Sequence, residues 1–150
     1  GPVYETPPLE ENLYFGGPPR LHVNVNTATV GGQLYALLED CSDGVCIHIG
    51  HAIMDLRYHA GGSEVQTWNP LTDEITALME FFAMDVEVQA GHTIRLSIRS
   101  TGEDYLPSAA SSISTIIDSG STLQLDTFDP ETREYYQTVQ CTAQVCLTNA

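Results

Sequence analysis

The chain has 150 residues, of which twenty are acidic and five are basic, and its formal net charge is −15. A chain of this length fits one domain, which buries roughly two thirds of its unfolded surface. The negative charge repels phosphate backbones and anionic lipid, so we expect no nucleic-acid partner. The sequence has no long apolar run, and we therefore also expect no membrane insertion.

Four cysteines stand in two pairs of equal spacing, Cys41 with Cys46 and Cys141 with Cys146. An Asp-Gly dipeptide inside the first pair is typical of a hairpin turn, which brings flanking side chains within disulfide distance. We predict local disulfides and, from them, a secreted, extracellular protein. Cross-pairing of the two groups and four buried thiols remain alternatives, because spacing does not determine connectivity. The first residue is Gly1, so either a leader has been removed or Gly1 and Pro2 remain from a cleaved tag, and an extracellular location favours the mature N-terminus.

Residues 1–19 form a proline-rich segment in front of the first regular strand pattern. Proline disfavours helix, so we predict an extended arm, followed by a β-sandwich domain over residues 20–150. Three apolar residues within the arm, Leu13, Tyr14 and Phe15, indicate that part of it docks on the domain.

Alternating apolar and polar residues predict the early strands of the domain. Leu21, Val23 and Val25 alternate with polar residues, which is typical of a strand with one buried face. Residues 33–39 predict a second strand, and residues 45–58 predict a third that is long for a single strand.

The clearest strand pattern in the chain lies at residues 86–100, where two alternating runs flank an Ala-Gly dipeptide. In the second run Ile94, Leu96 and Ile98 alternate with polar residues. We predict that the two runs pair with each other as a hairpin. Residues 75–84 are compatible with a short helix by propensity, but their continuation into the hairpin favours a strand.

The remaining segments have weaker patterns. Residues 60–73 and 102–114 predict loops, and short strands are predicted at 113–117 and 123–125, with a longer one at 135–145. About eight strands separated by turns, with little convincing helix, predict an all-β sandwich.

Several short motifs occur in an order that resembles one known module. They are Pro-Pro-Leu-Glu-Glu at 7–11, Gly-Pro-Pro-Arg-Leu at 17–21, Leu-Tyr-Ala-Leu-Leu-Glu-Asp at 34–40, the segment 50–58, and Ala-Gly-His-Thr-Ile-Arg-Leu-Ser-Ile at 90–98. Together they resemble the C-terminal jelly-roll domain of X-prolyl dipeptidyl-peptidases and cocaine-esterase-like hydrolases, over roughly residues 7–107. The tail from Ser108 onward does not match this pattern.

The resemblance implies a jelly-roll-like β-sandwich of about eight antiparallel strands. In the family this module packs on a separate α/β-hydrolase domain, which supplies the nucleophilic serine, the acid and the histidine. The present chain has no Gly-x-Ser-x-Gly elbow, and its serine clusters at 111–112 and 119–121 lack the strand-turn-helix setting of a nucleophile. We therefore expect no catalytic residue in this chain and predict that it is not an enzyme.

His48, His51 and His59 lie close together in the sequence and are candidate metal ligands. On one strand His48 and His51 point to opposite faces, unless Gly50 carries a bulge. We expect no metal site and no cofactor. His92 follows the turn of the predicted hairpin, and we predict a structural role in which it hydrogen-bonds that hairpin.

From these observations we predict a non-catalytic extracellular structural module that associates with copies of itself or with other extracellular proteins. The arm and the tail depart most from the sandwich scaffold, and each is able to add a strand to a neighbouring sandwich. Head-to-tail contacts of this kind do not close, so they predict a filament. The predicted assembly residues are Val3, Tyr4, Leu13, Tyr14 and Phe15 of the arm and Tyr135, Tyr136, Val145 and Leu147 of the tail.

Two alternatives belong to other functional classes. The first is an accessory domain of a larger serine peptidase or esterase, which predicts a bare apolar face where the hydrolase domain would sit. The second is a carbohydrate-binding module, because seven tyrosines and Trp68 are able to form a stacking platform for sugars.

Overall fold

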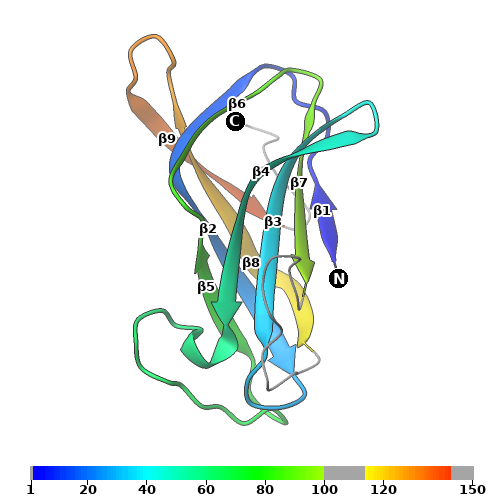
Figure 1. The fold of residues 1–150 in the computed structure, drawn as a ribbon, viewed down its shortest axis with the longest axis vertical. Coiled ribbons are helices and arrows are strands. Elements are labelled where there is room, and N and C mark those ends of the chain that lie inside the picture. Colours follow the sequence, from blue (N-terminus) through cyan, green and yellow to red (C-terminus); the bar gives the residue numbers. More distant parts are fainter. Residues whose placement is uncertain (1, 100–113, 143–150) are drawn as a thin grey trace.

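Two antiparallel sheets face each other in the computed structural model, which describes residues 2–99 and 114–142 (Figure 1). The first sheet has the strand order β1-β7-β3-β4. Its strands are β1 (Val3–Glu5), β7 (Thr93–Arg99), β3 (Gln33–Ser42) and β4 (Val45–Asp55).

The second sheet has the order β5-β2-β8-β9, and β6 also pairs with β2. Its strands are β2 (Leu13–Thr27), β5 (Ile75–Glu80), β6 (Met84–Val88), β8 (Ser114–Phe128) and β9 (Tyr135–Thr142). The predicted all-β, jelly-roll-like sandwich of antiparallel strands is confirmed, with nine strands among the described residues instead of about eight.

The core lies between the two sheets and follows the period-2 alternation of the strands. Phe15, Val23 and Val25 of β2 are fully buried and meet the buried Leu34 and Leu38 of β3 within one apolar cluster. Removing each such side chain from water stabilises the fold by about 1.5–3 kcal/mol, so this alternation determines which face of each strand points inward.

The arm is part of both sheets. Strand β1 pairs with β7, and residues 13–19 form the first half of β2. Between these strands, Thr6 is buried, and its backbone N–H donates to the Ile94 carbonyl at 2.9 Å. The predicted boundary between residues 19 and 20 therefore falls inside a single strand.

The predicted hairpin at 86–100 is wrong. Strand β6 pairs with β2 in one sheet, whereas β7 pairs with β1 and β3 in the other. The turn itself is present, because His92 N–H donates to the Gln89 carbonyl at 3.1 Å and Gly91 has a φ of 86°. The chain crosses here from one sheet to the other, so that Val88 and Ile94 face the core from opposite sides. Two adjacent alternating runs have the same sequence pattern whether they pair as a hairpin or lie in opposite sheets, so the pattern alone does not distinguish these arrangements.

Strand β4 carries a bulge near its middle. Leu38 is opposite Gly50, but the next residue, Glu39, is opposite His48, so Ile49 is an extra residue in β4. The strand therefore carries the bulge beside Gly50 that the sequence left open. A Cβ atom at this position would lie 2.8 Å from Cε of Met84, so glycine allows the start of β6 to approach the edge of β4 closely.

The helix alternative for residues 75–84 is also resolved, because β5 and β6 occupy most of this segment. The predicted loop at 60–73 follows a 3₁₀ turn at Leu56–Tyr58. Trp68 anchors the loop, since its indole is buried and donates to Oγ1 of Thr27 at 2.8 Å. No helix in the described part of the chain is long and apolar enough to cross a membrane.

The predicted strands at 113–117 and 123–125 are parts of the single strand β8, which a register irregularity interrupts. The loop predicted at 102–114 lies almost wholly outside the described residues.

Candidate functional site

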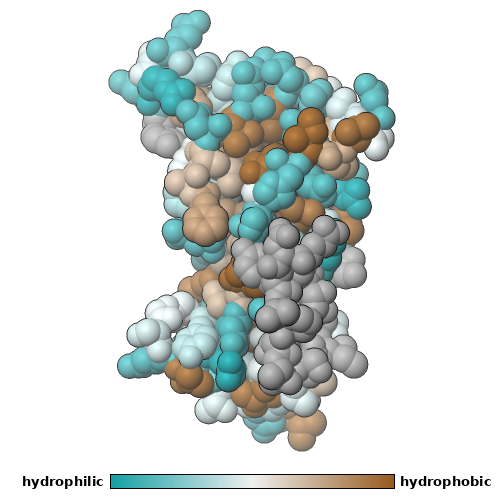
Figure 2. All heavy atoms as spheres, in the orientation of Figure 1, coloured by the Kyte–Doolittle hydropathy of each residue, from teal (hydrophilic) through white to brown (hydrophobic). Residues whose placement is uncertain are grey.

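Strand β4 is the outer strand of its sheet, and exposed apolar side chains gather along it and along β6. Figure 2 shows hydrophobic residues, in brown, in the upper half of the view, where Figure 1 places the labels of these two strands. Ile47 on β4 is 66% exposed, and Phe82, just before β6, is 79% exposed. We call this surface the β4–β6 edge and define it by Val45, Ile47 and Ile49 of β4 together with Phe82, Met84 and Val86.

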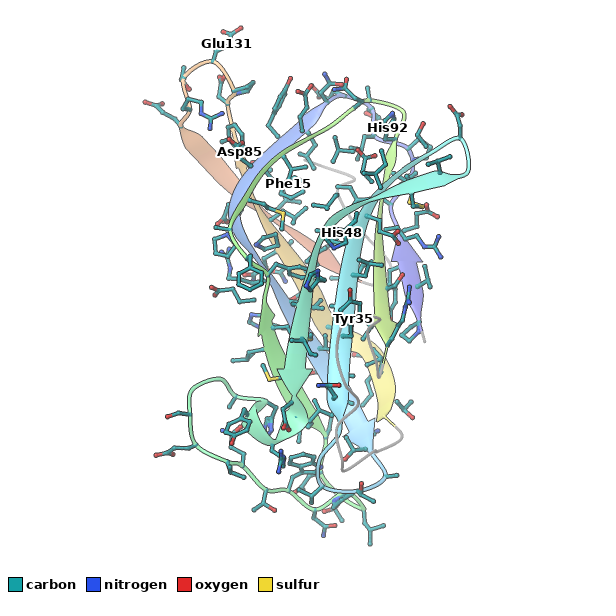
Figure 3. All side chains as sticks on the ribbon, viewed as in Figure 1. Phe15, Tyr35, His48, Asp85, His92 and Glu131 are labelled. Carbon is teal, nitrogen blue, oxygen red and sulfur yellow. A yellow bond between two sulfur atoms is a disulfide. The ribbon has the colours of Figure 1, made fainter. Side chains whose placement is uncertain are left out.

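The bulge in β4 places His48 and His51 on the same face of the sheet. Nε2 of His48 lies 3.1 Å from Nδ1 of His51, and the ring centroids are 5.3 Å apart. His51 also stacks on Tyr35 of β3, with ring centroids 5.7 Å apart and an interplanar angle of 23°. Figure 3 labels His48 on β4 and Tyr35 on the neighbouring strand.

A disulfide joins Cys41 at the end of β3 to Cys46 at the start of β4, with an S–S distance of 2.03 Å. The two residues face each other in the strand register, beside the turn that contains Asp43 and Gly44. The local pairing predicted for the first cysteine pair is confirmed. Cys141 is also disulfide-bonded, and Cys146 lies outside the described residues.

The other two histidines considered above occupy structural positions. Nδ1 of His92 lies 2.8 Å from Oδ1 of Asp40, so His92 links its turn to β3 instead of to the preceding run. His59 packs its ring edge-on against Trp68, 5.4 Å between centroids, and burial lowers its pKa. Neither histidine contributes to the pair on β4.

The outer face of the second sheet carries a charged pair that the sequence did not indicate. Two guanidinium nitrogens of Arg20 donate to the two carboxylate oxygens of Asp126, at 2.9 and 3.1 Å. Oγ1 of Thr138 donates to the same carboxylate at 2.8 Å. The hydrogen bond from Arg20, more than the charge itself, lowers the pKa of Asp126. These groups come from three neighbouring strands, and only the register brings them together.

The predicted assembly residues of the arm lie largely in the interior of this domain. Leu13 and Phe15 are buried in the core, and Tyr4 packs against it, whereas Val3 remains about half exposed. The hydroxyl of Tyr14 donates to Glu87 at 3.0 Å, and its ring contacts Phe128. A contact between two copies through Leu13 or Phe15 would require part of the arm to leave its own sheets.

The assembly residues of the tail are not placed by the structure. Tyr135 and Tyr136 lie in β9, but their side chains fall outside the described part of the structure. Val145 and Leu147 lie beyond it altogether. Of the proposed sugar platform, Trp68 and Tyr35 are buried, which removes both from the exposed surface.

Fold, register and disulfide together define an antiparallel β-sandwich of the jelly-roll class. A model of the family described as X-Pro dipeptidyl-peptidase C-terminal non-catalytic domain matches residues 1–143. The chain belongs to this family, as the motif order indicated, and the match extends beyond Ser108 into the tail that the motifs did not cover.

Several solved structures have a similar fold. An aminopeptidase from the marine sediment archaeon Thaumarchaeota archaeon aligns over 85% of this chain, with a TM-score of 0.71 and 13% identity. An α-amino acid ester hydrolase aligns over 70%, with a TM-score of 0.63 and 18% identity. A CocE/NonD family hydrolase from Staphylococcus aureus aligns over 84%, with a TM-score of 0.62 and 10% identity.

At these identities the likeness concerns the fold alone. The matched region is 25% of the aminopeptidase, 19% of the ester hydrolase and 30% of the CocE/NonD hydrolase. The chain thus spans less than a third of the length of each. The comparison with curated proteins found no match.

Proposed function

We propose that this domain is the non-catalytic accessory part of a hydrolase related to X-Pro dipeptidyl-peptidases and that it packs against an α/β-hydrolase domain. The observation that carries the proposal is the family match, whose own description is a non-catalytic domain. The coverage of the similar structures supports it, because the chain corresponds to a quarter or less of two proteins described as an aminopeptidase and an ester hydrolase. Catalysis in this proposal belongs to the other domain.

The β4–β6 edge is the surface that we assign to this contact. It combines an outer strand with exposed Val45, Ile47 and Phe82, of which Phe82 is a large aromatic side chain held almost entirely in water. Exposed apolar clusters of this kind occur where another protein surface covers them. Packing on a hydrolase domain would bury Phe82 and satisfy the open backbone edge of β4.

The first test is to determine the coding sequence on both sides of the segment that encodes this chain. We expect an α/β-hydrolase domain in the same reading frame, with a Gly-x-Ser-x-Gly nucleophile elbow. If the chain is encoded without such a domain, the proposal fails.

The second test concerns the contact surface in the full-length protein. Ile47→Thr combined with Phe82→Ser should lower the temperature at which the two domains separate, measured by calorimetry and by limited proteolysis between them. Leu71→Ser is the matched control, because Leu71 is 91% exposed but lies in the loop at 60–73. Equal effects of the control and the double variant would contradict the assignment of the edge.

Self-association through the arm is a second proposal. Strand β1 has only three residues and is joined to β2 by residues 6–12, so it is a segment that two copies are able to exchange. Open-ended exchange would produce the filament predicted from the sequence. Sedimentation at working salt tests it, since a strictly monomeric protein with β1 on its own sheet rules this route out.

We also propose an extracellular or otherwise oxidising location. The disulfide between Cys41 and Cys46 supports it, because such bonds persist mainly outside the reducing cytosol. Mass spectrometry of alkylated native protein should find these two cysteines unmodified by the alkylating reagent.

A further inference from the structure

The bulge in β4 is what brings His48 and His51 together. Without the extra residue Ile49, two positions three residues apart would face opposite sides of the sheet. With it, Nε2 of His48 and Nδ1 of His51 face each other at 3.1 Å on the outer side. His48 is exposed and His51 is partly buried, so the pair is open to solvent on one side.

The distance between the two nitrogens suits a shared metal ion. Imidazole nitrogens bind transition metals at about 2.0–2.1 Å, and two of them held 3.1 Å apart would subtend roughly 100° at the ion. This angle lies between those of square-planar and tetrahedral coordination. We propose that Nε2 of His48 and Nδ1 of His51 chelate one divalent transition-metal ion, with Cu²⁺ bound most tightly.

The surroundings favour an ion held by nitrogen and oxygen atoms. Tyr35 is buried and stacks on His51, which restricts the rotation of that ring before any ion arrives. Glu39 is opposite His48 in the register and on the same face, where its carboxylate attracts a cation. Cys41 and Cys46 are joined in their disulfide and offer no thiolate. Imidazole with oxygen ligands suits Cu²⁺, Ni²⁺ and Zn²⁺.

Two features of the surroundings moderate the affinity. No group of three histidine, cysteine, aspartate or glutamate side chains within residues 2–99 and 114–142 is arranged to hold an ion, so the described residues supply the two imidazoles and no third ligand. Arg95 is opposite Glu39 on its other side, and its guanidinium opposes the attraction of that carboxylate. The site is therefore a two-histidine chelate and not a buried structural centre.

Binding requires a rearrangement of hydrogens but no covalent chemistry. In the ion-free pair, one of the two facing nitrogens donates its hydrogen to the lone pair of the other. When the ion binds, that hydrogen moves to the second nitrogen of the same ring, and both facing lone pairs point at the metal.

The test is a titration of the folded chain with CuCl₂, followed by calorimetry and by electron paramagnetic resonance. We expect one site with hyperfine coupling to two imidazole nitrogens. His48→Asn or His51→Asn should weaken this site roughly 100-fold, because the second imidazole of a chelate binds intramolecularly. His22→Asn is the matched control, since His22 is a partly buried histidine on β2 in the other sheet, and it should change nothing.

Two further measurements distinguish a specific site from nonspecific binding. Cu²⁺ should bind more tightly than either Ni²⁺ or Zn²⁺, and Mg²⁺ should not compete for the site. Cu²⁺ should raise the melting temperature of the wild-type chain but not of the double variant His48→Asn, His51→Asn. The proposal is overturned if the double variant binds Cu²⁺ as tightly as the wild type, or if His22→Asn removes as much affinity as either β4 variant.

Discussion

Strands β8 and β4 both depart from regular pairing, but they use the departure differently. In β8 the residues between Ile117 and Thr122 interrupt the register with β2. Hydrogen bonds close this irregularity from within, because Oγ of Ser121 accepts from the Asn24 backbone N–H at 2.9 Å and donates to the Ile117 carbonyl at 2.6 Å. In β4 a single extra residue sets two imidazoles side by side at the surface.

The irregularity in β8 has a structural role, whereas the bulge in β4 exposes two imidazole side chains at the surface. Around β8, the amide of Asn24 also donates to the Ser119 carbonyl at 2.8 Å and accepts from Thr76 at 2.7 Å, so the polar groups of this bulge stabilise the sheet. Around β4, the two imidazoles share a hydrogen bond that is open to water, and His51 stacks on Tyr35. We therefore expect changes in the β8 bulge to cost stability and changes in the β4 pair to cost binding.

The largest effect is expected at Gly120. Its φ is 78°, and a Cβ there would lie 2.7 Å from Nδ2 of Asn24, so alanine would both strain the backbone and displace that amide. Gly120→Ala should lower the free energy of unfolding by roughly 2–3 kcal/mol, measured by urea denaturation.

Gly62→Ala is the control for backbone strain alone. Gly62 has a φ of 81°, and nothing lies within 4 Å of the place a Cβ would take. The difference between the two variants measures the hydrogen bonds of Asn24. If both lose the same stability, the β8 bulge is not held by that side chain, and the contrast with β4 weakens.

The next effect in size concerns the disulfide at the end of the β3–β4 hairpin. Replacing Cys41 and Cys46 together by serine should lower the free energy of unfolding by about 2 kcal/mol, the value expected for opening so short a loop in the unfolded chain. Thermal unfolding without reductant makes the measurement while the disulfide of Cys141 is kept. A loss below about 0.5 kcal/mol would mean that strand pairing alone holds this hairpin.

A smaller effect is expected for the charged pair on the second sheet. Arg20→Met should cost about 1 kcal/mol, because the bidentate contact with Asp126 is partly exposed. The pKa of Asp126 is lowered in the folded chain. Its contribution is therefore complete above the usual carboxyl pKa and is lost as pH falls toward the folded value. The test is to measure the free energy of unfolding of the wild type and of Asp126→Asn as the pH is lowered. The same pH dependence in both proteins would contradict the prediction.

Sequence patterns predicted the strands better than their partners. The alternation at Leu21–Val25 and at Ile94–Ile98 identified two strands with buried faces, and both are confirmed. The strand pairing predicted for residues 86–88 was wrong, because a hairpin and a crossing between sheets require the same alternation and the same turn. Only contacts with β2, distant in sequence, distinguish the two.

The bulges show a second limit. Ser119, Gly120 and Ser121 have the composition of a loop, so two short strands were predicted where the structure has the single strand β8. Hydrogen bonds with Asn24 of β2 hold the two halves of β8 together. At Gly50 the sequence left two arrangements open, a regular strand with His48 and His51 on opposite faces and a bulge that places them on one face. Whether the extra residue is present depends on the register with β3, which no local pattern determines.

The smallest expected change in stability is the one that most sharpens the contrast between the two bulges. With EDTA present, the double variant His48→Asn, His51→Asn should unfold within about 0.5 kcal/mol of the wild type, because His48 is exposed and the imidazole–imidazole hydrogen bond is open to water. Urea denaturation of both proteins at neutral pH makes the measurement. A loss as large as that of Gly120→Ala would mean that the pair holds the β4 bulge together, as Asn24 and Ser121 hold that of β8. A loss near zero in EDTA, with a clear loss once Cu²⁺ is added to both proteins, would place the histidines at the surface for binding.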